Sequence, residues 1–156
     1  PVRGKQSLIP LLRFLGSPPD ARSTVLAESA RQVANGWKHR GAVYLLTDLM
    51  DEHWQDALRT LLARRHELTL IHTLSPQELR PDLMGDLLLV DSETGETREV
   101  SLSASALSLY QRALQQLRDD ASALCGHFGG NYLLADTSQP LETFVLREMR
   151  MRGVLA

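Results

Sequence analysis

The residues best placed to do chemistry follow one short apolar segment. Ala42 to Thr47 is followed at once by Asp48, with Asp51 and Glu52 shortly after. If the segment is a strand of a parallel sheet, Asp48 and the Thr47 hydroxyl stand at its carboxyl end, where open α/β sheets bind ligands. Carboxylate and hydroxyl oxygens suit a hard divalent cation such as Mg²⁺. The same spacing also fits a structural role, in which Asp48 caps the following helix.

Other familiar active-site patterns are missing from the sequence. It contains no G-x-S-x-G, H-E-x-x-H, paired C-x-x-C or G-x-G-x-x-G motif. The single cysteine, Cys125, falls on the apolar side of a helical pattern and is expected to be a small core residue. The spacing of His66 and His72 favours a surface histidine and a hydrogen-bonded strand histidine over a pair of metal ligands.

Composition places the chain among soluble globular proteins. It has 156 residues, 43% of them apolar, with 17 basic side chains against 19 acidic ones and a formal net charge of −2. This length supports one core without a disulfide or a metal. The absence of a basic cluster argues against a nucleic-acid surface, and no apolar run is long enough to span a membrane.

Helices are predicted where apolar residues recur every three or four positions. The recurring apolar residues, including Trp37, Leu141 and Leu146, are expected to face the core, and the longest helix is expected to be a core helix rather than a coiled coil. The predicted helices cover residues 5–15, 23–39, 51–65, 104–127 and 137–152.

Strands are predicted in the short apolar runs between these helices. Residues 42–47 form an almost wholly apolar run without polar alternation, which is typical of a parallel strand buried on both faces. Residues 67–74 are predicted to form the next strand, and residues 131–136 a third strand of the buried type. The strand-helix-strand order predicts a parallel pair joined by a right-handed crossover. Residues 87–91 and 97–100 flank a polar turn and are expected to form a hairpin added to this sheet. The fold class is therefore α/β, with a mostly parallel sheet.

Several segments resemble one family in order and spacing. They are Gly41 to Asp51, His72 to Leu79, Leu89 to Gly95, Tyr110, and Arg152 to Leu155. The family is the bacterial domain of unknown function 58, whose C-terminal half is similar to a von Willebrand factor A domain. The resemblance implies a three-layer, Rossmann-type fold and a single such domain over residues 1–156.

Domains of that type bind a divalent cation at a metal-ion-dependent adhesion site built from three loops. Ser23-Thr24 resembles the second loop, with Thr24 as a metal ligand, and Thr47-Asp48 resembles the third, with Asp48 as a ligand. The D-x-S-x-S motif of the first loop is absent from the sequence. The resemblance therefore implies a partial site at Thr24 and Asp48, with Mg²⁺ bound weakly or not at all.

Either the first motif has been lost, or the chain begins downstream of it. We favour the second explanation, because the sequence begins without Met and shows only the strands that such domains place fourth, fifth and sixth. The first three strands of the domain would then be missing, and the strand at Ala42 to Thr47 would have one unpaired edge. An unpaired apolar edge invites pairing with another chain, so we predict self-association through this strand or misfolding.

The resemblance implies a non-catalytic adaptor that accompanies AAA+ ATPases of the MoxR type, with the cation completing its shell from an acidic side chain of the partner. This domain would be cytoplasmic, while the parent protein could be anchored in the membrane.

An alternative is a phosphoryl-transfer domain, receiver-like or phosphatase-like, with Asp48 as the acceptor. That chemistry usually needs a lysine near the strand ends, and Lys5 and Lys38 both fall in predicted helices. A hydrolase would need a nucleophile and a base, for which Ser75 and His72 are the only neighbouring pair.

Overall fold

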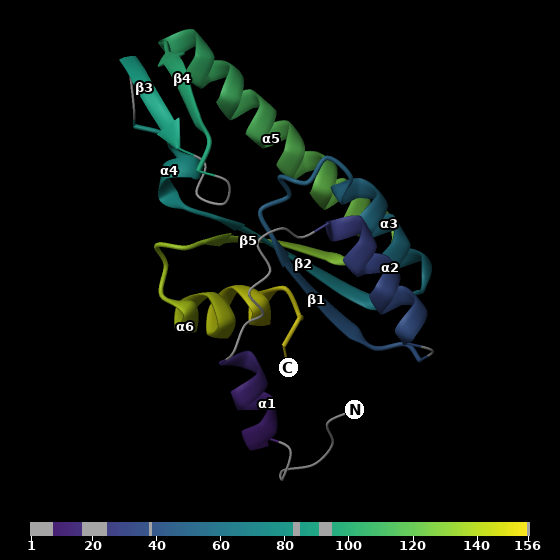
Figure 1. Cartoon of the computed structure of the whole chain (residues 1–156). Helices are drawn as coiled ribbons and strands as arrows, with labels where there is room; N and C mark the ends of the chain where they lie inside the picture. The colour runs from purple at the N-terminus through teal and green to yellow at the C-terminus, as the bar shows by residue number, and fades with distance from the viewer. Residues whose placement is uncertain (1–7, 17–24, 38, 83–84, 91–94, 156) are drawn as a thin grey trace.

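The computed structural model describes residues 8–16, 25–37, 39–82, 85–90 and 95–155. The predicted α/β class is confirmed: a parallel sheet and a separate hairpin alternate with helices (Figure 1). The elements in chain order are α1 (Leu8–Leu15), α2 (Leu26–Gly36), β1 (Ala42–Thr47), α3 (Trp54–Ala63), β2 (Glu67–Leu74), α4 (Pro76–Leu79), β3 (Gly85–Val90), β4 (Thr97–Leu102), α5 (Ala104–His127), β5 (Asn131–Asp136), α6 (Leu141–Thr143) and the π-helical turn η2 (Phe144–Met149).

The main sheet has the strand order β1-β2-β5, and both pairs are parallel, as predicted. Its three strands have the predicted boundaries. In the observed register Thr47 lies opposite His72, and Leu74 lies opposite Asp136. The carboxyl ends of the three strands therefore meet at one edge of the sheet, which brings together the loops that follow them.

Helices cover both faces of this sheet (Figure 1). On one face α2, α3 and α5 enclose the larger core, to which β2 contributes Leu68 and Leu70. On the other face Ile71 of β2 and Leu133 of β5 pack against η2. Each face of β2 thus contributes to a different core, which is why the strand is buried over most of its length although half of its residues are polar.

Strand β1 departs from the prediction of burial on both faces. Val43 and Leu45 pack against the larger core, but Tyr44 and Leu46, on the opposite face, are 44% and 65% exposed. The reason is position: β1 is the end strand of the sheet, and η2 packs on β2 and β5 instead. The Tyr44 hydroxyl reaches the C-terminal segment, donating to the Val154 carbonyl at 3.5 Å.

Three residues predicted to face the core are exposed. Trp37 follows the end of α2 at Gly36 instead of lying inside a longer helix. Leu141 and Leu146 are exposed because the last helix changes to a π-helical turn, in which hydrogen bonds span five residues. That period places Phe144 and Met149, five residues apart, on the buried face instead.

Helix α5 has the predicted bounds and is the longest of the described helices. It buries Leu114, Ala121 and Cys125, so the predictions of a core helix and of a core cysteine are confirmed. Burial raises the pKa of the Cys125 thiol to about 11. Within the described residues, no helix is both long and apolar enough to cross a membrane.

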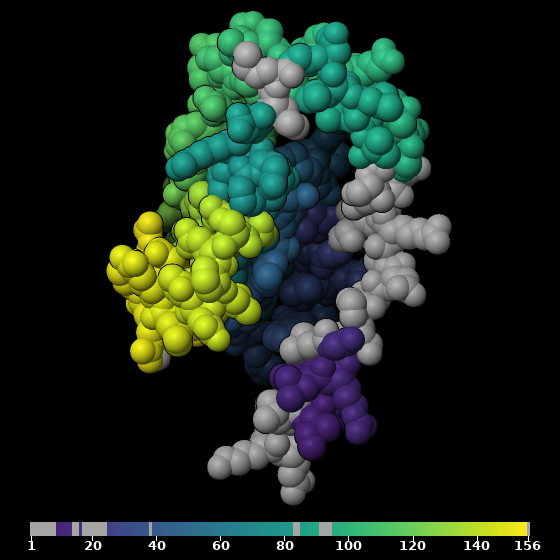
Figure 2. Space-filling model, turned by 90° about the vertical axis from the view of Figure 1, so that its left-hand side faces the viewer, coloured from purple at the N-terminus to yellow at the C-terminus, as the bar shows by residue number. Residues whose placement is uncertain are grey.

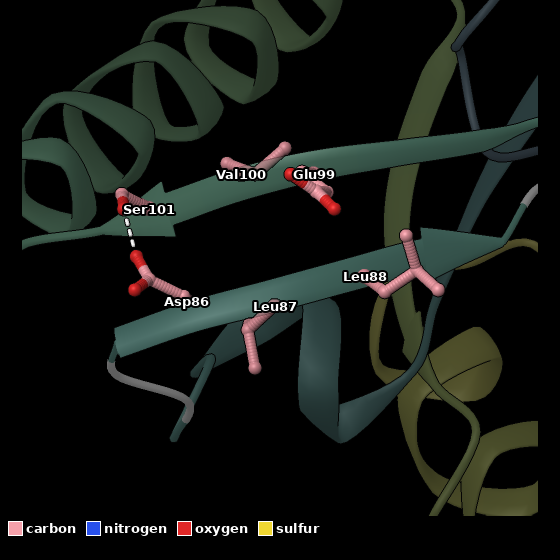
Figure 3. Close-up of a pocket in the computed structure, with 6 residues that line it drawn as sticks. All are labelled: Asp86, Leu87, Leu88, Glu99, Val100 and Ser101. Atoms are coloured by element: carbon pink, nitrogen blue, oxygen red, sulfur yellow. Dashed lines mark hydrogen bonds between the residues drawn. The ribbon is translucent and has the colours of Figure 1, made fainter.

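Strands β3 and β4 form the predicted antiparallel hairpin, but as a sheet of their own and not as part of the main sheet. Asp86 of β3 accepts a hydrogen bond from Ser101 of β4 (Figure 3). Leu88, Leu89 and Val90 of β3 are exposed. In Figure 2 the hairpin lies at the top of the molecule, opposite the end that carries α1.

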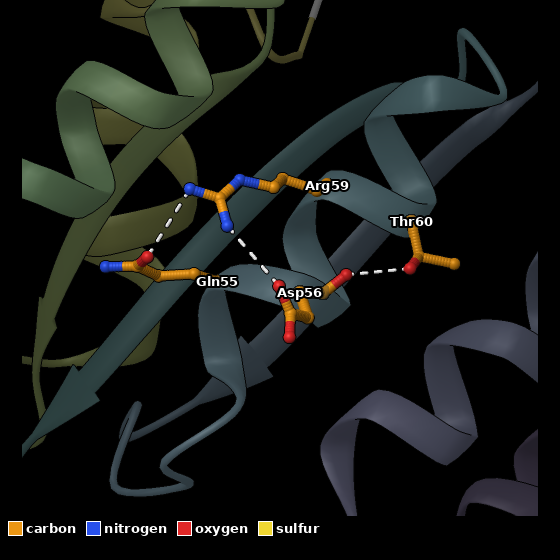
Figure 4. A network of polar contacts seen from close by, with 4 residues as sticks. All are labelled: Gln55, Asp56, Arg59 and Thr60. Carbon is orange, nitrogen blue, oxygen red and sulfur yellow. Dashed lines mark hydrogen bonds and ion pairs between the residues drawn. The ribbon is translucent and has the colours of Figure 1, made fainter.

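The outer face of α3 is a solvated surface. Arg59 donates to Asp56 Oδ1 at 3.3 Å and to Gln55 Oε1 at 3.5 Å, and the Thr60 hydroxyl donates to the Asp56 carbonyl at 2.7 Å (Figure 4). The ion pair is exposed, and such pairs add less than about 1 kcal/mol to stability. These residues support the helix and build no site.

Arg65, just beyond α3, adopts a left-handed backbone conformation with φ of 56°. Glycine has no steric cost in this region, and it is the residue most common at this position after a helix. We expect Arg65→Gly to raise the free energy of unfolding by about 0.5–1 kcal/mol, measured by urea denaturation. Arg64→Gly is the matched control and should give no gain, since Arg64 has a negative φ.

Candidate functional site

A cavity of about 490 Å³ opens at the carboxyl edge of the main sheet, where parallel α/β sheets bind ligands. All three strands or the loops that follow them contribute to it, together with α4. Six of its seven lining residues carry a side-chain oxygen: Thr47, Asp48, Thr73, Ser75, Glu78 and Thr137, with Leu46 as the seventh. This donor set suits a hard cation or a hydrogen-bonded polar group.

The loop from β1 to α3 is fixed by bonds from its own side chains. Thr47 Oγ1 accepts from the Leu49 amide at 3.1 Å, and Asp48 Oδ1 accepts from the Met50 amide at 3.0 Å. Leu49, between them, is buried and has a φ of 59°, a strained region for a branched side chain. The two side-chain bonds and the burial of Leu49 hold the backbone in this conformation.

Asp48 does not cap α3, so the alternative prediction that it serves as a helix cap is wrong. The helix begins at Trp54, and its N-cap residue is His53. Asp51 instead bonds the amides at the start of α3. Its carbonyl accepts from the Trp54 amide at 3.1 Å, and its Oδ1 accepts from the His53 amide at 2.7 Å.

Asp51 also connects this loop to α2. Its Oδ2 accepts a hydrogen bond from the amide of Leu26, the first residue of α2, at 2.9 Å. These backbone hydrogen bonds lower the pKa of the Asp51 carboxyl, the bond from Leu26 having the largest effect. The sequence placed Asp51 only in a helical turn and gave no sign of this link, because the partner is a backbone amide 25 residues earlier.

The predicted ligands Thr24 and Asp48 have different outcomes. Thr24 lies outside the described residues. Asp48 is exposed and lines the cavity, and of its two carboxylate oxygens only Oδ1 accepts a hydrogen bond from a described residue. The described part of the chain contains no cluster of three or more His, Cys, Asp or Glu residues able to hold a metal. The metal site at Thr24 and Asp48 stays a prediction.

Glu78 supplies the second carboxylate of the cavity. It forms a capping box with Ser75: the Ser75 amide donates to Glu78 Oε2 at 2.6 Å, and the Glu78 amide donates to Ser75 Oγ at 3.2 Å. The box holds the short helix α4 against the end of β2. Tyr110 of α5 secures the other side of α4 by donating to the Glu78 carbonyl at 2.8 Å.

Beneath the cavity lies a buried histidine. His72 is fully buried in β2; its Nε2 is 3.1 Å from the Asp48 carbonyl oxygen and its Nδ1 is 2.9 Å from the Tyr132 hydroxyl. A carbonyl can only accept, so we assign the proton to Nε2. Burial is the main reason why the pKa of His72 is lowered, which favours the neutral ring. In that form Nδ1 accepts, and the Tyr132 hydroxyl is the donor.

The hydrogen-bonded chain ends near Arg118 of α5. Burial raises the pKa of the Tyr132 phenol, while the nearby Arg118 acts in the opposite direction. A polar connection therefore runs from the Asp48 carbonyl through His72 to Tyr132, with Arg118 beside it. Tyr132 lies opposite Leu70, which is two residues from His72 on the neighbouring strand. A polar ring in the interior of each strand was the available signal.

The two histidine predictions have opposite outcomes. His72 is the hydrogen-bonded strand histidine that was expected, and both of its ring nitrogens are used away from Ser75, so the two do not form a nucleophile–base pair. His66 was expected at the surface but is buried, and neither of its ring nitrogens has a partner among the described residues. It lies in the turn between α3 and β2, directly before the first residue of β2.

The sequence model of one protein family matches residues 1–120, and its description is "Protein of unknown function DUF58". An uncharacterized protein of Mycobacterium avium is 29% identical, over 94% of this chain and 89% of its own length. Uncharacterized proteins of Mycobacterium bovis and Mycobacterium tuberculosis are 28% identical over 98% of this chain.

The match covers 50% of the M. bovis and M. tuberculosis proteins, so the chain spans about half the length of these relatives. No solved structure matches the chain.

Proposed function

The chain belongs to the family of proteins of unknown function DUF58, and we propose that it is a non-catalytic interaction module that acts as an adaptor for an AAA+ ATPase of the MoxR type. One observation carries the proposal: the cavity at the carboxyl edge of the sheet, lined almost entirely by oxygen-bearing side chains. Such an edge presents loops for recognition on a rigid sheet. The proposal places the module in the cytoplasm beside its ATPase.

A von Willebrand factor A-like fold is part of this proposal. Its support is the order of three parallel strands, β1-β2-β5, with helices on both faces and with β1 at the end of the sheet. This is the arrangement expected for the fourth, fifth and sixth strands of such a domain. The expectation of a single domain lacking its first three strands belongs to the same proposal.

The cation of the proposed site would be held by Asp48 and Thr24, with waters and an acidic side chain of the partner completing its shell. The cavity fits a hard cation in donor type, because its polar side chains offer only oxygen. Its two carboxylates, Asp48 and Glu78, are few for a cation bound by this chain alone. The residues therefore suit a cation such as Mg²⁺ that binds more tightly when a partner supplies a further carboxylate.

Binding of the full chain to a purified MoxR-type ATPase, with and without Mg²⁺, tests the proposal. We expect Mg²⁺-dependent binding that Asp48→Asn weakens by about tenfold or more, because a neutral amide is a poorer ligand for a hard cation. Glu52→Gln is the matched control, since Glu52 is exposed in the same loop and outside the cavity lining. Binding of the same strength with and without Mg²⁺, or equal weakening by both variants, would contradict the proposed site.

The alternative of phosphoryl transfer draws support from one feature, the exposed Asp48 carboxylate at the end of a parallel strand. Mass spectrometry after incubation with a small phosphodonor distinguishes the two functions. A phosphoryl adduct on Asp48 would favour the alternative. An unmodified chain that still binds the ATPase with Mg²⁺ would favour the adaptor.

A further inference from the structure

A second cavity, of about 580 Å³, lies beside the first at the carboxyl edge of the sheet. It is formed by α4, α5, β5 and the turn after β5. Pro76 and Leu79 of α4 line it, while Ser75 and Glu78 of the same capped turn line the first cavity. The two cavities are therefore neighbours separated by α4, and this volume is in the range of small-molecule sites.

The charge of the second cavity is opposite to that of the first. Arg80 and Arg118 are its two basic residues, and Asp136 is the one carboxylate of the lining. One oxygen of Asp136, Oδ1, already accepts from the Ser138 amide at 2.8 Å and from the Ser138 hydroxyl at 2.6 Å. These bonds are the main reason why the pKa of Asp136 is lowered, and the charge of Arg80 adds to the effect. The cavity therefore has two guanidinium groups and one carboxylate, of which one oxygen already accepts hydrogen bonds from Ser138, and its net charge is positive.

Arg118 is held in place but incompletely bonded. It emerges from α5, donates weakly to Gln115 Oε1 at 3.4 Å, and lies close enough to Tyr132 to affect the pKa of the phenol. Its Nε is buried and has no hydrogen-bond partner among the described residues. Leaving a buried donor unbonded is unfavourable, more so on a charged group. No described carboxylate forms an ion pair with this guanidinium, so its charge remains available to a ligand.

We propose that this cavity is an oxyanion-binding site in which Arg118 and Arg80 bind a phosphate or carboxylate group of a small ligand. The planar guanidinium fork matches the oxygens of both groups, and the Gln139 side chain adds a polar contact at the same wall. Arg118 is the central residue, because its Nε is the buried donor that has no partner among the described residues. Arg80 is exposed and supplies the second charge. The site does not depend on the adaptor role proposed above.

Titration of the full chain with inorganic phosphate, and separately with succinate, tests this site. The readout is the Nε–H signal of Arg118 in a ¹H–¹⁵N spectrum, at constant ionic strength. We expect one of the two anions to shift this signal saturably, and the one that binds more tightly identifies the ligand class. Chloride at the same ionic strength should leave the signal unchanged.

Variants separate the site from general electrostatics, with calorimetry as the readout. Arg118→Lys keeps the charge but loses the fork, and should weaken binding by about tenfold or more. Arg80→Gln changes an exposed residue and should also weaken binding, so the test does not depend on how the Arg118 variant folds. Arg112→Lys is the control on the same helix, because Arg112 is exposed and its Nε donates to the Ser108 carbonyl. Equal binding by all three variants, or no saturable shift with either anion, would overturn the proposal.

Discussion

Replacing Tyr132 with phenylalanine should lower the free energy of unfolding by about 1–3 kcal/mol, although the change removes a single oxygen. The Tyr132 hydroxyl is the donor to His72 Nδ1 at 2.9 Å, and His72 is fully buried. Without it, Nδ1 is an acceptor without a partner in the core. Urea denaturation of the full chain gives the free energy directly.

A matched control exists in β1. Tyr44 also donates to a carbonyl, that of Val154, but at 3.5 Å and at the surface, so Tyr44→Phe should change stability by less than about 0.5 kcal/mol. A double-mutant cycle with His72→Leu sharpens the test, since the double variant removes donor and acceptor together. We expect it to cost less than the sum of the two single variants, by about 1 kcal/mol. Additive losses would show that the two side chains do not act as a hydrogen-bonded pair.

The lowered pKa of His72 also sets the direction in which the stability of the fold should change with pH. Burial lowers its pKa in the folded protein below the ordinary value of 6.5, so the unfolded chain binds the proton more readily. The contribution of the buried neutral His72 to the free energy of unfolding is therefore complete above about pH 6.5. It is lost progressively as the pH falls below that value. The His72→Leu variant should lose this part of the pH dependence. An unchanged slope between pH 6.5 and 5 would show that His72 is not the titrating group.

The three main strands were predictable because their signal is local and strong. Residues 42–47, 67–74 and 131–136 are short segments with adjacent apolar residues between helical patterns, as a parallel sheet with helices on both faces requires. The longest helix was predictable for the same reason, since its three- and four-residue spacing persists over many turns. Where one period dominates a segment, the pattern and the tertiary structure agree.

Burial depended on neighbours that a local pattern does not contain. Leu46 has the composition of a core residue but lies on the end strand of the sheet, beyond the reach of η2. Leu141 and Leu146 follow an α-helical spacing that a π-helical turn then shifts. His66 is a polar residue carried into the core by the start of β2. In each case the deciding element is distant in the chain or differs in period.

Only part of the candidate site was predictable from the sequence, because its other residues are brought together by elements that are distant in the chain. Asp48 could be placed at a strand end from its position after an apolar run, and it lines the cavity there. Its link to Tyr132 through His72 joins the loop after β1 to β2 and β5, and no spacing in the sequence encodes it. The arginine-lined cavity was missed because Arg80 and Arg118 lie 38 positions apart and meet only when α4 packs beside α5.

The edge of β1 carries the second large effect that we predict. β1 pairs with β2 on one side, and within the described residues no strand pairs with its other side. Its exposed face carries Tyr44 and Leu46, so the unpaired backbone groups lie next to apolar side chains. Natural edge strands are usually protected by charge, proline or a covering element. We therefore expect the isolated chain to self-associate by pairing this edge with the same strand of a second copy.

A charge on that face should oppose such pairing. Leu46→Lys adds a solvated ammonium group beside the edge, and we expect the dissociation constant from sedimentation equilibrium to rise by about tenfold or more, equivalent to about 1.4 kcal/mol. Leu88→Lys is the matched control: Leu88 is 61% exposed, against 65% for Leu46, but lies on the separate hairpin. If the wild-type chain is a stable monomer at all concentrations, the edge tolerates solvent and needs no partner. If both variants weaken association equally, exposed apolar area drives it, and the position of β1 at the end of the sheet does not.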